Sequence, residues 1–124
     1  MARKILMIED DLTLSESFTK TMKDAGYDMH VANDGETGFR QAEELRPDLI
    51  LLDLVLPKKH GFKVMEDLKN NPELRSIPVV VLTNLETPHD IERASTLGAK
   101  AYLVKANYSL SEIRRKVEEI LANQ

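Results

Sequence analysis

The sequence contains no cysteine, so it has no disulfide framework, no thiolate zinc site and no cysteine nucleophile. It also has no excess of basic charge: 17 Lys and Arg stand against 21 Asp and Glu, and the net charge of −4 argues against binding to bulk nucleic acid. Its apolar runs are too short for a signal peptide or a membrane span. We therefore expect the 124 residues to form one soluble, cytoplasmic domain over residues 1–124 that binds neither nucleic acid nor membranes.

Five short apolar segments indicate β-strands. The most apolar is Leu-Ile-Leu-Leu at residues 49–52, which is typical of a strand buried on both faces and ends at a single acid, Asp53. Residues 27–32 give a weaker strand signal, with apolar and polar residues more alternating, which suits the edge of a sheet. The five predicted strands lie at residues 5–8, 27–32, 49–52, 79–82 and 101–104.

The segments between these strands have apolar residues at helical spacing, which predicts five helices. Residues 13–16 match a capping box for the first helix, and residues 109–112 match one for the last. In the fourth, Thr87 is expected at the cap with Pro88 in the first turn, and the inward-facing residues are expected to be Ile91, Ala94 and Leu97. Strands that alternate with helices indicate an α/β fold with a doubly wound parallel sheet.

Polar side chains follow four of the predicted strands: Glu9 and Asp10, Asp53, Thr83, and Lys105. In open α/β sheets, ligands bind at the carboxyl edge of the strands, and these side chains should meet there. Carboxylates that lie close together repel one another unless a cation joins them, and oxygen ligands suit Mg²⁺. With a hydroxyl donor and a lysine for an anion, this set of groups indicates phosphoryl transfer onto a carboxylate.

The whole chain resembles a response-regulator receiver domain of the CheY type. The matching motifs are the Glu9-Asp10 pair, Asp53 followed by Pro57 and Gly61, Thr83, and residues 102–105. This resemblance implies a flavodoxin-like fold with strand order 2-1-3-4-5. It also implies a signalling phosphoprotein of a two-component system, not an enzyme, which accepts a phosphoryl group on Asp53 from the phosphohistidine of a sensor histidine kinase or phosphotransfer protein.

The resemblance assigns a role to each matching residue. Asp10, Asp53 and the main-chain carbonyl of Val55 would bind Mg²⁺ directly, and Glu9 would act through bound water. Lys105 would pair with the acceptor or the phosphoryl oxygen.

Two further residues, Thr83 and Tyr102, would form the switch. Thr83 would reorient toward the phosphoryl group and Tyr102 would swing inward behind it. The resulting change would alter the surface formed by the fourth helix, the fifth strand and the fifth helix, and hence its affinity for a downstream protein. Because the chain stops at Gln124, we expect output through that partner, with the domain a monomer or a dimer formed on phosphorylation.

Several residues depart from the pattern of the family. Ala106 follows Lys105 where proline is usual, so we expect a trans peptide bond there. Asn84 replaces a small residue and is expected to narrow access to the site. Lys58-Lys59-His60 precede Gly61 in place of the usual hydrophobic and acidic residues, and we expect both lysines to be solvated. The three histidines, His30, His60 and His89, lack metal-ligand spacing and are read as surface residues.

Val55 and Leu85 are apolar residues two positions after Asp53 and Thr83. Neither side chain can position an attacking water by hydrogen bonding, so we expect slow intrinsic dephosphorylation.

Three other interpretations stay open. An aspartyl-phosphate phosphohydrolase of the haloacid-dehalogenase type would need an acid where Val55 stands. A receiver-like interaction module that is never phosphorylated is compatible with Ala106 and Asn84. Finally, Asp10 and Asp11 could simply cap the first helix, and this is the role that we expect for Asp11.

Overall fold

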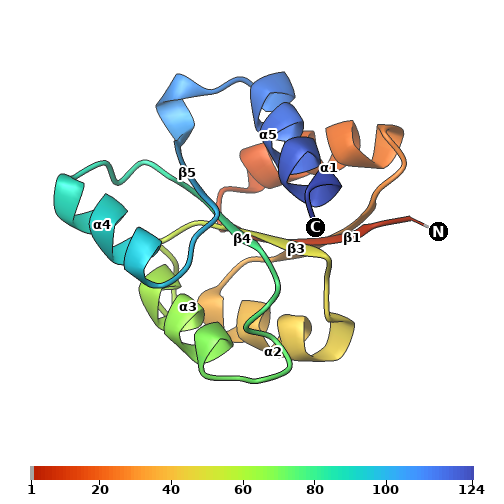
Figure 1. Cartoon of the computed structure of the whole chain (residues 1–124). Helices are drawn as coiled ribbons and strands as arrows, with labels where there is room; N and C mark the ends of the chain where they lie inside the picture. The colour runs from red at the N-terminus through yellow and green to blue at the C-terminus, as the bar shows by residue number, and fades with distance from the viewer. Residues whose placement is uncertain (1) are drawn as a thin grey trace.

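The computed structural model describes residues 2–124, which form one sheet of five parallel strands covered by helices on both faces (Figure 1). The strands are β1 (Lys4–Ile8), β2 (Asp28–Ala32), β3 (Leu49–Leu52), β4 (Val79–Thr83) and β5 (Ala101–Val104). The helices are α1 (Leu12–Asp24), α2 (Gly35–Leu45), α3 (Gly61–Lys69), α4 (Pro88–Thr96) and α5 (Leu110–Ala122), with a short 3₁₀ helix at Lys105–Asn107. No helix within residues 2–124 is both long enough and apolar enough to cross a membrane.

The strand order is β2-β1-β3-β4-β5, which confirms the predicted α/β flavodoxin-like fold. The central strand β3 is buried over its whole length, as its uninterrupted apolar sequence predicts. Its register pairs Leu52 with Ile8 of β1 and with Val81 of β4. The carboxyl ends of β1 and β3 are therefore level with each other, and β4 continues two residues further, to Thr83, at the same edge of the sheet.

Alternating residues of each strand face two separate cores. On one side, α1 and α5 cover residues such as Met7, Leu51 and Val80; on the other, α2, α3 and α4 cover Ile50 and Val81 (Figure 1). Because successive side chains of a strand point to opposite faces, a strand covered on both sides must be apolar at every position. This requirement explains the runs that the sequence shows at β1, β3 and β4.

The caps of the helices agree with the sequence in two cases and differ in one. Thr87 caps α4 with Pro88 in the first turn, and Ser109 forms the capping box of α5 with Glu112, both as predicted. The predicted capping box at residues 13–16 is wrong, because α1 begins earlier, at Leu12. Its cap is Asp11, whose carboxylate accepts a hydrogen bond from the backbone N–H of Leu14 at 3.1 Å. Asp11 is thus the capping acid that we expected.

The inward face of α4 is narrower than its sequence predicts. Ala94 is fully buried and Leu97 is partly buried, but Ile91 is exposed. Three residues turn a helix by about 300°, so Ile91 lies about 60° away from the line of Ala94 on a helix that covers the sheet near its edge. The prediction that Ile91 faces the core is therefore wrong.

The histidines agree with the prediction at two positions and differ in part at the third. His60 and His89 are exposed, as expected. His60 also caps α3, because its Nδ1 accepts a hydrogen bond from the backbone N–H of Phe62 at 3.2 Å. His30 is partly buried, because it lies within β2 and is paired with Leu6 of the neighbouring strand; its Nε2 is 3.1 Å from the carboxylate of Asp28.

Candidate functional site

Five polar side chains meet at the carboxyl edge of the sheet, where the sequence predicts them. Glu9 and Asp10 follow β1, Asp53 follows β3, Thr83 is the last residue of β4, and Lys105 follows β5. These positions are far apart along the chain and are brought together because the parallel strands all end at the same edge of the sheet.

Three of these groups are carboxylates that lie within reach of a single cation. Glu9, Asp10 and Asp53 each offer an oxygen atom within 4.8 Å of the others. Glu9 is 1% exposed and Asp53 is 6% exposed, whereas Asp10 lies at the surface. Like charges this close to one another repel, so the cluster favours a bound cation.

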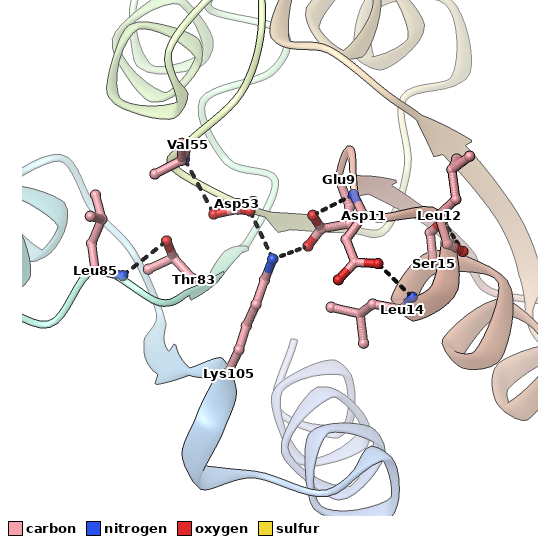
Figure 2. A network of polar contacts seen from close by, with 10 residues as sticks. All are labelled: Glu9, Asp11, Leu12, Leu14, Ser15, Asp53, Val55, Thr83, Leu85 and Lys105. Carbon is pink, nitrogen blue, oxygen red and sulfur yellow. Dashed lines mark hydrogen bonds and ion pairs between the residues drawn. The ribbon is translucent and has the colours of Figure 1, made fainter.

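Lys105 neutralises part of this negative charge. Its Nζ donates a hydrogen bond to Oδ2 of Asp53 at 2.8 Å and lies 2.7 Å from Oε1 of Glu9 (Figure 2). One ammonium group thus bridges the two buried carboxylates. One positive charge cannot balance all three acids, so the site stays attractive to a divalent cation.

The buried position of Glu9 changes its acidity. Burial raises the pKa of the Glu9 carboxyl to about 6; the hydrogen bond from Lys105 opposes this shift, and the nearby charge of Asp53 adds to it. For Lys105, burial alone would lower the pKa of the ammonium group, but its hydrogen bonds to Asp53 and Glu9 outweigh burial and raise it. Lys105 therefore remains charged at neutral pH.

Thr83 and Tyr102 are linked through the backbone of one residue, Leu85. The buried Oγ1 of Thr83 accepts a hydrogen bond from the backbone N–H of Leu85 at 3.4 Å (Figure 2). The hydroxyl of Tyr102 donates to the carbonyl of the same Leu85 at 2.7 Å. Burial raises the pKa of the Tyr102 hydroxyl, with smaller contributions from Asp90 and Asp53, so this hydroxyl keeps its proton.

A depression of about 290 Å³ opens above Asp53. Because one water occupies about 30 Å³ in the liquid, there is room for a hydrated ion and a phosphoryl group. Val55 is 54% exposed, and its backbone N–H donates to Oδ1 of Asp53 at 3.2 Å. The depression is lined by Asp10, Asp53, Val55, Thr83, Asn84, Leu85 and Lys105.

The ligands that these residues offer fit a hard divalent cation such as Mg²⁺. Carboxylate oxygens from Asp10, Asp53 and Glu9 are the donors that Mg²⁺ prefers, and the depression leaves space for the waters that it retains. The residues of this chain are thus suited to the metal that the sequence predicts.

Magnesium should therefore stabilise the folded protein. A ligand that binds only the folded state adds about 2.7 kcal/mol to the free energy of unfolding at a concentration of about 100 times its dissociation constant. We expect thermal unfolding, followed by circular dichroism, to move to higher temperature with MgCl₂ but not with KCl of the same ionic strength. Asp10→Asn should remove the shift, and Asp11→Asn, in the neighbouring cap, should retain it. A shift of equal size in both variants would contradict this cation site.

Two departures from the family pattern are also visible in the structure. All peptide bonds within the described residues are trans, which confirms the prediction for the Lys105–Ala106 bond. Lys59, which we expected to be solvated, is partly buried: its ammonium group is paired with Asp67 at 2.6 Å and lies over the ring of Phe39. That prediction is wrong, because the loop folds back onto α2 and α3.

Two contacts of the site were missed by the sequence reasoning: the direct pairing of Glu9 with Lys105, and the place of Leu85 between Thr83 and Tyr102. Opposite charges at the ends of two strands could have suggested the first. The second depends on backbone groups, which leave no signal in the sequence.

Comparisons with known proteins agree with this arrangement. A family model described as the response regulator receiver domain matches residues 5–118. The chain is 41% identical to the transcriptional regulatory protein CiaR of Streptococcus pneumoniae over 95% of its own length and 51% of CiaR. It therefore spans about half the length of such curated relatives.

Solved structures share the fold. The signal receiver domain of a histidine kinase from Syntrophus aciditrophicus is 31% identical, with a TM-score of 0.88, over 98% of this chain and 92% of that chain. The Mn²⁺-bound form of response regulator Rcp1 is 35% identical, with a TM-score of 0.79, over 95% and 91%. With the family match over nearly the whole chain, we conclude that this protein belongs to the response-regulator receiver domains of two-component systems.

Proposed function

We propose that this receiver domain is a phosphorylation switch that accepts a phosphoryl group on Asp53 with Mg²⁺. The observation that carries the proposal is the position of the Asp53 carboxylate, 2.8 Å from the Lys105 ammonium and within 4.8 Å of the carboxylates of Glu9 and Asp10. Asp10, Asp53 and the main-chain carbonyl of Val55 would hold the metal directly, with Glu9 acting through water. The receiver domain of the sensor histidine kinase PA1611 from Pseudomonas aeruginosa holds a magnesium ion in its active-site cleft, and Rcp1 is known in a Mn²⁺-bound form.

In the proposed reaction, a carboxylate oxygen of Asp53 attacks the phosphorus of a phosphohistidine. The new P–O bond forms as the P–N bond breaks, and the electron pair of the P–N bond returns to the imidazole of the donor. A divalent cation held by Asp10 and Asp53 would supply positive charge for the phosphoryl oxygens. Lys105 can keep one hydrogen bond to the site while Asp53 turns from carboxylate to acyl phosphate, so that charge developing in the transition state meets a fixed cation.

The switch would work through Thr83, Leu85 and Tyr102. The hydroxyl of Thr83 can turn to donate to the phosphoryl group, and Leu85 must then find another acceptor for its N–H. Because the carbonyl of Leu85 holds the hydroxyl of Tyr102, a change at Thr83 reaches the ring of Tyr102 through one residue of backbone. The phosphoryl group would thus bias an equilibrium between two arrangements of this loop, by as much as it binds them differently.

The output would be a change in the surface formed by α4, β5 and α5, and hence in its affinity for a downstream protein. The donor would be a sensor histidine kinase or a phosphotransfer protein. We propose a cytoplasmic domain over residues 1–124 that works as a monomer or dimerises on phosphorylation, without itself contacting nucleic acid or a membrane, and that is not an enzyme.

A test with a small phosphodonor separates this function from its rivals. We expect acetyl phosphate with Mg²⁺ to add one phosphoryl mass to the intact protein, and chelation of Mg²⁺ to prevent the addition. No adduct would favour an interaction module that is never phosphorylated. Steady turnover of phosphate esters would favour a phosphohydrolase, which we do not expect because Val55 stands where that chemistry needs an acid.

The phosphorylated state should be long-lived. Val55 and Leu85 line the depression above Asp53 with apolar side chains, which cannot orient an attacking water. We expect the adduct to decay over minutes to hours at neutral pH with Mg²⁺, measured by intact mass after the donor is removed. Val55→Asn, at an exposed position, should shorten the lifetime about tenfold by holding a water, a modest effect beside that of a full general base. Val55→Ala should not shorten the lifetime. A lifetime of seconds for the phosphorylated protein without substitutions would contradict this prediction.

A further inference from the structure

The loop between β3 and α3, residues 54–60, is anchored by an unusual lysine. Lys59 has 24% of its side chain exposed, and its Nζ donates to Oδ2 of Asp67 on α3 at 2.6 Å. The same ammonium group lies 4.8 Å from the centre of the ring of Phe39 on α2. One loop side chain therefore contacts both helices that flank the loop, through an ion pair and a cation–π contact.

The lowered pKa of the Asp67 carboxyl agrees with a strong ion pair between Asp67 and Lys59. Burial by itself would raise the pKa of the Asp67 carboxyl, but hydrogen bonds from Lys59 and Lys63 outweigh burial and lower it. Lys63 lies 3.2 Å from the other carboxylate oxygen of Asp67. However, Lys63 belongs to α3 and is 60% exposed, so it holds Asp67 without holding the loop.

The backbone of the loop also docks onto the start of α2. The N–H of Gly35 donates to the carbonyl of Pro57 at 3.2 Å. The carbonyl of Lys59 lies so close to Gly35 that a Cβ atom at that position would stand 1.9 Å from the carbonyl oxygen. The residue between Pro57 and Lys59, Lys58, has φ of 68°, in the left-handed region that favours glycine. The path of the loop is thus imposed by its contacts, not by local preference.

This loop leads directly from the phosphoacceptor. Val55 lies two residues before Pro57, and its N–H donates to Oδ1 of Asp53 at 3.2 Å. In the proposed function, the main-chain carbonyl of Val55 would be the third metal ligand. A loop that is free to move at Lys59 would let this carbonyl move as well.

We propose that Lys59 is a positioning residue for the metal site, because it clamps the β3–α3 loop between Phe39 and Asp67 and so fixes the backbone of Val55. This inference rests on the proposed function. It makes a prediction of definite sign. A positive charge near an acidic site repels Mg²⁺, so if Lys59 acted through its charge alone, its removal would tighten Mg²⁺ binding. If Lys59 acts by position, its removal weakens binding.

The test is the Mg²⁺ dissociation constant of the full chain, followed by titration in amide NMR spectra. We expect Lys59→Ala to weaken binding about tenfold, at the lower end of the effects seen for residues that hold metal ligands in place. Lys63→Ala is the matched control, since it removes the other cation on Asp67, and binding should not weaken. Lys59→Arg keeps the charge and a long side chain and should retain most of the affinity.

A second readout does not need the metal. In Mg²⁺-free protein, we expect the backbone amides of Val55 and Gly35, which donate to Asp53 and to the loop carbonyl of Pro57, to exchange with solvent faster in Lys59→Ala than in the chain without substitutions, while amides of β3 stay unchanged. If Lys59→Ala does not fold, Asp67→Asn weakens the same clamp from the helix side and should give the same two results.

Three outcomes would overturn the inference. The first is Mg²⁺ binding that is unchanged or tighter in Lys59→Ala. The second is a loss of thermal stability in Lys59→Ala with no change in the Mg²⁺ dissociation constant or in the amide exchange. The third is an equal weakening of Mg²⁺ binding in Lys63→Ala. Failure of the unmodified protein to bind Mg²⁺ would instead contradict the proposed function. The amide exchange of Val55 and Gly35 in metal-free protein would then still decide whether Lys59 holds the loop.

Discussion

Asp53→Asn should abolish phosphorylation by acetyl phosphate, because an amide has no anionic oxygen to attack phosphorus. Asp53 lies at the centre of the candidate site: its carboxylate contacts Lys105, accepts the N–H of Val55 and is one of three acids within reach of a cation. The expected result, measured by intact mass, is complete loss of the adduct. Since asparagine has the same shape, thermal unfolding should show that the variant remains folded.

The control for this experiment is Asp11→Asn, which changes an acid near the site by the same chemistry. Asp11 caps α1, and asparagine caps helices equally well, so this variant should fold and accept the phosphoryl group as before. An adduct that persists in Asp53→Asn would place the acceptor elsewhere and break the assignment of the site.

Lys105→Met should destabilise the Mg²⁺-free protein by about 3 kcal/mol, because it leaves two buried carboxylates without their cation. The two acids, Glu9 and Asp53, are 1% and 6% exposed, and both lie within 2.8 Å of the Lys105 ammonium. Urea unfolding measures the free energy directly. Lys100→Met is the matched control, since Lys100 is exposed just before β5, and its change should be within about 0.5 kcal/mol.

The loss in Lys105→Met should depend on pH with a definite sign. In the unmodified chain the folded-state pKa of Glu9 is about 6, raised from the ordinary value of 4.5, so stability linked to the protonated form is lost as pH rises through about 6. Without Lys105, the ionised carboxylates of Glu9 and Asp53 have no counter-ion. The free energy of unfolding should therefore fall more, relative to the chain without substitutions, at about pH 8 than at about pH 5. A loss that is equal at both values, or absent, would contradict the role of Lys105 as counter-ion.

The fold follows closely from the pattern of apolar residues. A parallel sheet covered on both faces needs strands that are apolar throughout, and residues 49–52 and 79–82 could hardly satisfy another arrangement. The polar residue that ends each run then falls at the carboxyl edge of the sheet. For this reason the sequence alone is enough to predict that Asp53, Thr83 and Lys105 lie at that edge.

The features that were not predicted depend on contacts between distant segments. Thr13 to Glu16 satisfy the local pattern of a capping box, but Asp11 starts the helix earlier. Lys58 and Lys59 are adjacent lysines, a pattern typical of a solvated surface, yet Lys59 packs against α2 and α3 once the loop has folded. The link from Thr83 to Tyr102 uses the backbone of Leu85, which any residue would supply. Local sequence patterns are therefore reliable for strands and less reliable for caps and loops that tertiary contacts reshape.

The most direct test of the switch is a comparison of amide NMR spectra of the full chain with and without phosphorylation in the presence of Mg²⁺. We predict that shifts extend from Asp53 through Thr83 and Leu85 to Tyr102 and on to the exposed residues of α4 and α5, and that none of this occurs in Asp53→Asn. Shifts that stay within the immediate neighbours of Asp53, with α4, β5 and α5 unchanged, would contradict the account of this protein as a phosphorylation switch.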